Sequence, residues 1–226
     1  MDYISINELL LPQFIILKDD TFHVINQPSI RRENFAELNS NEPIITFIIP
    51  SIGRNTLPKT IESLQAMHDT NWKAIIVFDG IDPTVSYTDP RIQVIRIEKT
   101  GEGPNHAGRV RNAGIKIATT PWIGLVDDDD TLEPTYVTYM KSHLMEHSPD
   151  VIIFRMMYDN GGILPPPGAT SFEIGKVGIS FCFKTELCTE SCFVPSGVED
   201  FILLNTFRNQ SKRIFISPHV TYHVRS

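Results

Sequence analysis

Four consecutive aspartates, Asp127 to Asp130, follow the apolar segment 122–126. Carboxylates this close repel one another unless a cation or a set of hydrogen-bond donors lies among them. If segment 122–126 is a buried strand, the acids lie just beyond its carboxyl end, where open α/β sheets bind their ligands. The run therefore predicts a site for a divalent metal that carries a phosphorylated substrate. The alternative is a solvated acidic turn in which Asp130 caps the next helix.

The metal is expected to be Mn²⁺ or Mg²⁺. These ions prefer hard oxygens and need only one or two protein carboxylates, because water and phosphate complete the shell. Side chains alternate along a strand, so Asp127 and Asp129 share one face if the strand continues, and Asp128 then points away. Asp127 and Asp129 are therefore the expected carboxylate pair.

Two further acidic positions lie at the ends of predicted elements. Asp79 ends a second apolar run and could accept a hydrogen bond from a nucleobase imino group or a ribose hydroxyl, although Asp-Gly is also a common turn. Glu199 and Asp200 open a predicted helix. Either carboxylate could be a general base for a substrate hydroxyl, or both could only compensate the helix dipole.

Basic residues offer two candidate contacts for an anion. Arg109 and Arg111 follow a glycine-containing loop at a predicted helix start, which is a plausible anion site. His223 could complete a metal shell, and Arg225 beside it could meet a diphosphate, although both could equally be packed or surface groups. The glycines match neither the dinucleotide fingerprint nor the phosphate-binding P-loop pattern, which argues against those two sites.

The elements that must position these residues form an α/β pattern. Segment 44–49 is a continuous apolar, β-branched run ended by Pro50, as expected for a strand buried on both faces. Thr56 is the expected cap of the next helix, whose apolar stripe is Leu57, Ile61 and Leu64. The remaining elements predicted in the first half are strands at 72–78, 92–97 and 122–125 and a helix at 109–118. This order predicts a mainly parallel central sheet flanked by helices.

The second half of the chain is less regular. A glycine- and proline-rich loop at 160–180 is expected to be functional or mobile. The elements predicted around it are a helix from Pro134 to His147, a strand at 151–155, a helix opening at Glu199, and segments 213–216 and 220–225 at the end of the chain. Residues 1–42 are expected to be an N-terminal extension packed on a main domain at 43–226.

Composition narrows the functional class. The 226 residues carry a net charge of −7, and no basic stretch is present to neutralise a nucleic-acid backbone, which argues against a general nucleic-acid binder. The three cysteines lack zinc-site spacing and are expected to be reduced. We expect a cytoplasmic protein, because no basic leader, cleavage pattern or transmembrane run is evident. Peripheral membrane contact stays open.

The order of motifs resembles that of the family 2 glycosyltransferases with the GT-A fold. The resemblance covers about residues 43–226, and its strongest element is Arg-Asn-Ala-Gly-Ile at 111–115 followed by the aspartate run. The other motifs that carry it are Ile-Ile-Pro-Ser-x-Gly-Arg at 48–54, Ser-Leu-Gln at 63–65, Ile-Ile-Val-Phe-Asp-Gly-x-Asp at 75–82, and Gly-Val-Glu-Asp at 197–200. Phe78 and Ile81 depart from the family, which often has an acid and a serine at those positions.

The resemblance implies metal-dependent transfer of a sugar from a nucleotide-diphosphate sugar, with a UDP-hexose as the default donor, to an acceptor hydroxyl with inversion. It implies Asp200, with Glu199 beside it, as the catalytic base, and Asp127, Asp129 and His223 as metal ligands. The implied nucleotide-sugar contacts are Pro50, Ser51, Gly53, Arg54, Asp79, Arg111, Asp127 and Asp128. The acceptor, whether glycan, protein or lipid, stays unassigned.

Two alternatives belong to other functional classes. A metal-dependent nucleotidyltransferase would also use aspartates, but it would need a basic, glycine-rich phosphate loop, of which segment 51–54 is a poor version. A non-catalytic nucleotide-sugar- or glycan-binding domain would keep the fold without turnover.

Overall fold

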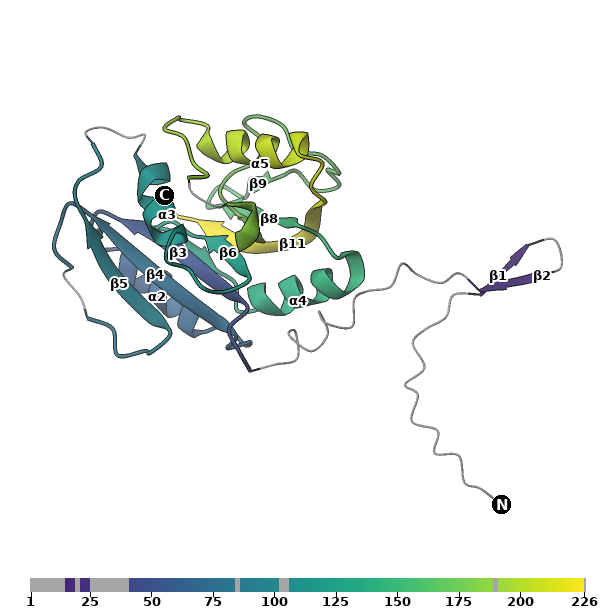
Figure 1. Ribbon diagram of the computed structural model, residues 1–226, viewed down its shortest axis with the longest axis horizontal. Coiled ribbons are helices and arrows are strands. Elements are labelled where there is room, and N and C mark those ends of the chain that lie inside the picture. The colour runs from purple at the N-terminus through teal and green to yellow at the C-terminus, as the bar shows by residue number, and fades with distance from the viewer. Residues whose placement is uncertain are drawn as a thin grey trace, which may run out of the picture.

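The structure is a computed structural model that describes residues 15–18, 21–24, 41–83, 86–101, 106–188 and 191–225 (Figure 1). Its main strands are β3 (Ile45–Ser51), β4 (Trp72–Asp79), β5 (Ile92–Ile97), β6 (Trp122–Leu125), β7 (Thr131–Leu132), β8 (Val151–Tyr158), β9 (Ile163–Leu164), β10 (Phe181–Lys184) and β11 (Ile214–Val224). Its helices are α2 (Leu57–Gln65), α3 (Ala107–Ile115), α4 (Tyr136–His147), the short 3₁₀ helix η1 (Thr185–Leu187) and α5 (Glu199–Asn209).

The main strands form one sheet in the order β5-β4-β3-β6-β10-β8-β11-β7, with β9 paired to β8. Strands β5, β4, β3, β6, β8 and β11 run in one direction, whereas β10, β7 and β9 run in the other. The predicted mainly parallel sheet is therefore confirmed. The carboxyl ends of β3, β4, β6 and β11 meet along one edge of the sheet, which is where ligands bind in open α/β sheets.

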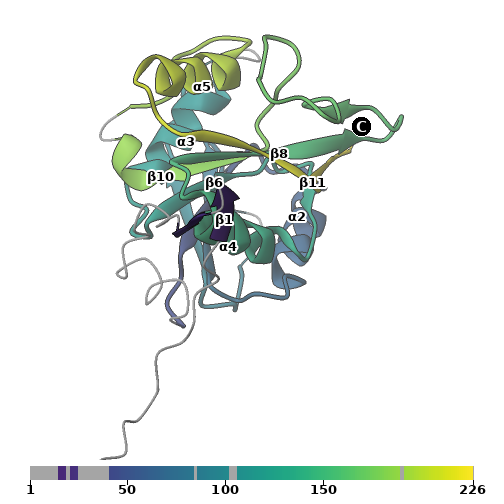
Figure 2. The same ribbon diagram turned by 90° about the vertical axis from the view of Figure 1, so that its right-hand side faces the viewer.

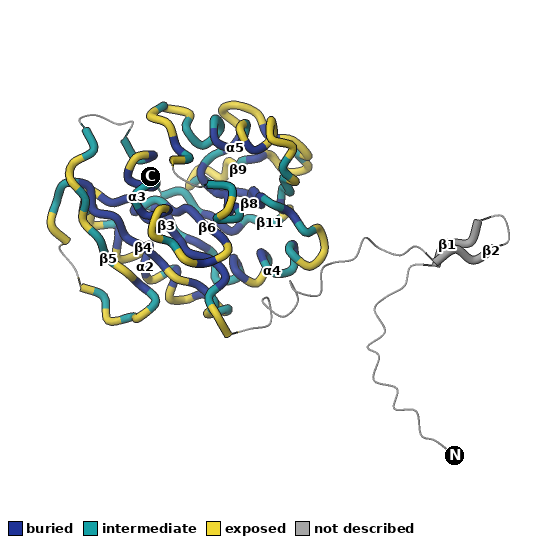
Figure 3. The backbone as a smooth tube through the Cα atoms, in the orientation of Figure 1, coloured by how far each residue is buried: buried dark blue, intermediate teal, exposed yellow. Residues whose placement is uncertain are grey.

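Helices cover both faces of the sheet. Viewed nearly along the sheet edge, α3 and α5 lie on one side and α2 and α4 on the other (Figure 2). Every residue of β3 is buried, as expected for a strand covered on both faces, and the central strands form the buried interior in Figure 3. The apolar stripe of α2 is buried as predicted, but Thr56 makes no side-chain capping bond, so that prediction is wrong.

Several predicted boundaries need correction. Helix α3 begins at Ala107 and ends at Ile115, and α4 begins at Tyr136 rather than Pro134. The two segments expected at 213–216 and 220–225 form one strand, because both halves pair with β8 around register shifts between Ile216 and Tyr222. Strands β7 and β10 were not predicted: the first has only two residues, and the second continues directly from the long loop.

The cysteines also depart from expectation. Cys188 and Cys192 form a disulfide, with their Cα atoms 5.5 Å apart, so the expectation that all three thiols are reduced is wrong for this pair. The third, Cys182, is a free and fully buried thiol in β10. It packs as a small apolar residue, as buried cysteines commonly do.

The N-terminal region is described only as the backbone of a hairpin, in which β1 (Ile15–Lys18) pairs antiparallel with β2 (Thr21–Val24). The expectation that residues 1–42 pack on the core therefore lies largely outside the described residues. Among the described helices, none combines the length and the apolar character needed to cross a membrane.

Gly114 provides a test of how α3 packs on the sheet. A Cβ at this position would lie 2.8 Å from Cγ2 of Ile48 and 3.0 Å from Cγ2 of Val77. Helix propensity alone makes alanine better than glycine by about 1 kcal/mol. We expect the opposite sign here: Gly114→Ala should lower the free energy of unfolding by about 1–2 kcal/mol, because the added methyl overpacks the interface.

Urea denaturation measures this change. The exposed Lys116→Ala, at the residue that follows α3, is the control and should shift stability by less than about 0.5 kcal/mol. A more stable Gly114→Ala variant would contradict the close packing of α3 on β3 and β4.

Candidate functional site

The four aspartates form a turn rather than a continuation of β6. Strand β6 ends at Leu125, and the Asp130 N–H donates to the Asp127 carbonyl at 3.1 Å. The premise of strand alternation through the run is therefore wrong. Asp128 also does not point away from the site: its carboxylate accepts from Ser51 Oγ at 2.7 Å and lies 3.4 Å from Arg54. Arg54 additionally pairs with Asp129.

Residues distant in the sequence hold this turn. The Tyr222 hydroxyl donates to Asp130 Oδ2 at 2.8 Å and accepts from the Asp127 N–H at 3.2 Å. The Arg225 N–H donates to Asp130 Oδ1 at 3.0 Å, and Thr60 Oγ1 donates to the Asp130 carbonyl at 2.7 Å. Asp130 is thus a buried acceptor for donors from the end of β11. It is not a cap of α4, which begins at Tyr136.

Arg111 joins three elements at the centre of the site. Its guanidinium projects from α3 and pairs with Asp127 of the acidic turn at 2.5 Å and with Glu199 at the start of α5. The Arg111 side chain is only 5% exposed. Burial alone would lower the pKa of Arg111, but the charges of Asp127 and Glu199 outweigh it and raise that pKa. Arg111 therefore stays a buried cation fixed between two carboxylates.

The residues around Arg111 position the segment that leads to α5. Asn112 Oδ1 accepts from the N–H groups of Cys192 and Phe193, and its Nδ2 donates to the Phe193 carbonyl at 2.8 Å. A Cβ at Gly108 would lie 2.7 Å from Glu199 Oε2. Only glycine lets α3 approach the start of α5 this closely.

Two cavities meet at Arg111 and Asp127, which line both. The larger has a volume of about 690 Å³ and is also lined by Lys99 and His106. It contains seven of the eight predicted nucleotide-sugar residues: Pro50, Ser51, Arg54, Asp79, Arg111, Asp127 and Asp128. The eighth, Gly53, shapes the turn behind it with φ +78°, where a Cβ would lie 2.6 Å from Ile81.

The second cavity, of about 320 Å³, contains the predicted catalytic pair. Glu199 and Asp200 line it together with Asp130 and Tyr158. Glu199 is paired with Arg111, whereas the Asp200 carboxylate accepts from backbone N–H groups, including that of Phe201 at 2.7 Å. Of the two acids, Asp200 is therefore the one that no arginine of the described residues contacts directly.

Asp79 lies at the end of β4 and is held by the loop after β5. Its Oδ1 accepts from the Thr100 N–H at 2.7 Å and its Oδ2 from Thr100 Oγ1 at 3.0 Å. The carboxylate is 9% exposed and lines the larger cavity. A ligand that donates a hydrogen bond to Asp79 would therefore share this carboxylate with Thr100, which already orients it.

The acidic turn has the donor set expected of a divalent-cation site. Carboxylate oxygens of Asp127, Asp129 and Asp130 lie within 4.8 Å of one another. Burial, together with the nearby charges of Asp127 and Asp129, raises the pKa of Asp130 to about 7. A bound cation would relieve this repulsion, so these residues fit a hard divalent ion. His223 is instead paired with Glu133, with Nε2 2.5 Å from Oε1.

Sequence reasoning missed several residues of this site. Tyr222, Thr60 and Thr100 had been given no role, and Asp130 had been considered only as a helix cap. Asn112 lies in the Arg-Asn-Ala-Gly-Ile motif, from which no role for it was predicted. The only signal for it was its place beside Arg111, since its contacts are made some 80 positions away.

Comparison with known proteins identifies the family. Residues 46–198 match the family described as glycosyl transferase family 2. The chain belongs to glycosyl transferase family 2. A succinoglycan biosynthesis protein of Rhizobium meliloti, ExoO, is 33% identical to this family 2 chain over 98 residues, which are 41% of this chain and 27% of that relative.

Solved structures show the same fold. TarS of S. aureus in complex with UDP superposes with a TM-score of 0.66 at 19% identity, covering 81% of this chain and 60% of that one. The mannosyltransferase PcManGT from Pyrobaculum calidifontis, in complex with GDP-Man and Mn²⁺, superposes with a TM-score of 0.61 at 16% identity, covering 82% and 57%. This family 2 chain has the GT-A fold. It spans less than two thirds of the length of each protein compared.

The importance of Arg111 can be tested because its side chain pairs with two carboxylates, those of Asp127 and Glu199. Arg111→Met should lower the free energy of unfolding by about 3 kcal/mol, because two carboxylates lose their buried partner. Arg109→Met, two residues away, removes only an exposed hydrogen bond to the Thr100 carbonyl and should change it by less than about 0.5 kcal/mol. Urea denaturation compares the two variants. Equal effects would show that the Arg111 pairs do not hold the site together.

The raised pKa of Asp130 gives a pH dependence of stability for the metal-free protein. The folded state holds a proton up to about pH 7, whereas the unfolded carboxyl releases it near pH 4. Stability should therefore fall as the pH rises from about 4 to 7, because the folded state binds more protons in that window. Burial also raises the pKa of Asp128, Glu199 and Asp200, which adds to the same slope.

Melting temperature measured against pH in the presence of a chelator tests this dependence. Asp130→Asn should make the slope between pH 4 and 7 shallower. Asp89→Asn is the control: the hydrogen bonds and charge of Arg91 lower the pKa of Asp89 to about 2, so this residue titrates below the window. An unchanged slope in Asp130→Asn would contradict the assignment.

Proposed function

We propose that this chain transfers a sugar from a nucleotide-diphosphate sugar to an acceptor hydroxyl with inversion, in a reaction that depends on Mn²⁺ or Mg²⁺. Family membership supports the glycosyltransferase class. The observation that carries the proposal is that a larger and a smaller cavity meet at Arg111 and Asp127. A donor in the first and an acceptor in the second would bring the anomeric carbon beside Asp200.

The larger cavity would hold the donor. Asp79 at one end and the acidic turn at the other supply acceptors for a nucleoside, and Lys99 and Arg54 supply positive charge at the cavity wall for phosphate oxygens. UDP-hexose is the proposed donor, supported by a similar fold solved with UDP-GlcNAc and UDP. A similar fold solved with GDP-Man makes guanosine donors the first comparison to include.

The cation would be held by Asp127, Asp129 and Asp130. When bound there, Mn²⁺ or Mg²⁺ would supply positive charge that stabilises the departing diphosphate. Arg111 would keep Asp127 oriented through its ion pair. Tyr222 would keep Asp130 oriented through its hydrogen bond, because both contacts are direct and buried. His223 was expected as a further ligand, but its pairing with Glu133 supports leaving it outside the donor set.

Asp200 would act as the base. The acceptor hydroxyl gives its proton to the Asp200 carboxylate, its oxygen bonds to the anomeric carbon, and the bond from that carbon to the diphosphate breaks with its electrons on the leaving group. A single displacement inverts the anomeric centre. Burial raises the pKa of Asp200, which strengthens it as a base near neutral pH. Glu199, held by Arg111, would position Asp200 rather than receive the proton.

Replacement of Asp200 tests the proposed reaction. The protein is incubated with Mn²⁺, an acceptor panel, and UDP- and GDP-linked sugars, and release of the nucleoside diphosphate is followed. Asp200→Asn should reduce the transfer rate at least about 100-fold, the scale of a lost general base, while metal-dependent binding of the nucleoside diphosphate stays within about threefold. The exposed Glu62→Gln on α2 is the control and should keep full activity.

Two outcomes would contradict the proposal. Near wild-type transfer by Asp200→Asn would show that another residue acts as the base. Release of pyrophosphate from a nucleoside triphosphate, without release of nucleoside diphosphate from any sugar donor, would indicate a nucleotidyltransferase instead.

A further inference from the structure

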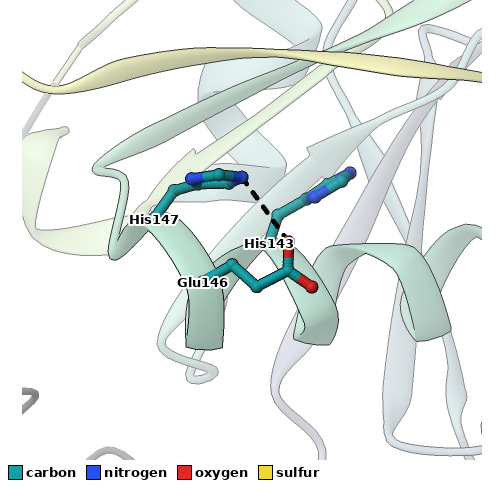
Figure 4. Close-up of side chains that lie close together, drawn as sticks. All are labelled: His143, Glu146 and His147. Atoms are coloured by element: carbon teal, nitrogen blue, oxygen red, sulfur yellow. Dashed lines mark ion pairs between the residues drawn. The ribbon is translucent and has the colours of Figure 1, made fainter. Parts of the chain in front are cut away.

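A second group of metal-ligating side chains lies outside the site described above. His143, Glu146 and His147 lie close together in the last two turns of α4 (Figure 4), and one ligand atom from each lies within 4.8 Å of the others. Helical residues three and four positions apart share one face, so a single helix presents all three. The acidic turn precedes the start of α4, whereas this group lies at the carboxyl end of the helix.

His143 is the buried member of the group. Its side chain is 4% exposed, and its Nε2 is 2.9 Å from Ser217 Oγ on β11. Its other ring nitrogen, Nδ1, is buried without a hydrogen-bond partner among the described residues. With the proton on Nε2, Ser217 accepts the hydrogen bond and Nδ1 keeps a buried lone pair. Burial lowers the pKa of His143 to about 4, so the ring is neutral at physiological pH.

Packing explains the ring positions but not this unpaired nitrogen. Phe215 stacks on His147 with ring centroids 4.1 Å apart and lies 4.8 Å from the His143 ring, which holds both imidazoles beside each other. A purely structural histidine would gain by pairing both nitrogens, since an unpaired buried polar atom costs stability. A buried, unpartnered ring nitrogen in a residue grouped with a second imidazole and a carboxylate is a donor that a metal ion could use.

We propose that His143 Nδ1, the Glu146 carboxylate and His147 Nε2 bind a divalent transition-metal ion, with Zn²⁺ as the best match. Two imidazoles and one carboxylate suit Zn²⁺, whereas the all-oxygen acidic turn suits Mg²⁺ or Mn²⁺. The helix carboxyl end also favours a cation through the helix dipole. This site is separate from the proposed transfer reaction and does not depend on it.

The geometry permits closure around an ion. Ligand atoms of a tetrahedral zinc site lie about 3.4 Å apart, given metal–ligand bonds of about 2.1 Å. The Glu146 side chain is 60% exposed and can rotate toward the two imidazoles, while the 43% exposed His147 ring already lies beside His143 on Phe215. One Glu146 oxygen already lies 3.6 Å from His147 Nε2, while the other accepts from Ser142. Ser217 would orient His143 from behind, as outer hydrogen-bond partners of metal-bound histidines do.

Calorimetric titration of the full chain with Zn²⁺, in excess Mg²⁺ to occupy the acidic turn, tests the site. Wild-type protein should bind Zn²⁺ saturably, and Zn²⁺ should raise its melting temperature. His147→Ala and Glu146→Gln should each weaken Zn²⁺ binding at least about tenfold and reduce the thermal shift. Both side chains are exposed, so these variants should fold. His68→Ala, at an exposed histidine of another segment, is the matched control and should bind as wild type does.

Cobalt provides an independent measurement. Co²⁺ bound to two imidazoles and a carboxylate should give visible absorption bands that His147→Ala loses. Absence of saturable Zn²⁺ binding in excess Mg²⁺ would overturn the proposal, as would unchanged affinity in His147→Ala. Loss of Zn²⁺ binding in Asp129→Asn, with binding retained in His147→Ala, would place the ion at the acidic turn and overturn it as well.

Discussion

The site depends on a buried arginine that two carboxylates hold in place. Arg111 pairs with Asp127 from the acidic turn and Glu199 from α5. Taking a guanidinium out of water costs several kcal/mol unless its partners and hydrogen bonds compensate. Helix α3, the turn after β6 and the start of α5 must therefore all be in place for Arg111 to be compensated. The same pairing fixes the wall that both cavities share.

A second constraint is the concentration of acid at one sheet edge. The turn is stable because Ser51, Tyr222 and the Arg225 N–H each place a donor on a particular carboxylate. These donors come from β3 and from the end of β11, which are brought to the same edge because both strands run parallel to β6. The direction of the strands thus explains how four consecutive aspartates can be partly buried without unfolding the edge of the sheet.

Much of the fold could be predicted from local pattern. Strands β3 and β4 are continuous apolar runs, and the aspartate run and Asp79 follow strands whose carboxyl ends must meet in a parallel sheet. The residues that gather in the larger cavity were found in this way. Short or irregular elements could not be predicted in this way. Strand β7 has only two residues, and β11 was predicted as two segments because its pairing with β8 is irregular.

The contacts that hold the site were beyond the reach of sequence patterns because they join distant positions. Tyr222 and Asp130 are 92 residues apart, and Thr60 and Asp130 are 70 apart. A tyrosine in an apolar strand gives no sign that its hydroxyl is a donor to a carboxylate. Alternation along β6 also failed at the turn, because period-two geometry ends where the strand ends. Side chains that touch only after the sheet has formed therefore need the structure.

Arg54 and Arg111, which form ion pairs with carboxylates of the acidic turn, differ in their freedom to respond to a ligand. Arg111 is buried between two acids, so its charge is committed to the fold. The Arg54 side chain is 46% exposed, lines the larger cavity and pairs with Asp129. A cation held by Asp129 would compete with Arg54 for that carboxylate. Such a ligand would leave the two ion pairs of Arg111 in place, because Arg111 contacts Asp127 and Glu199 and not Asp129.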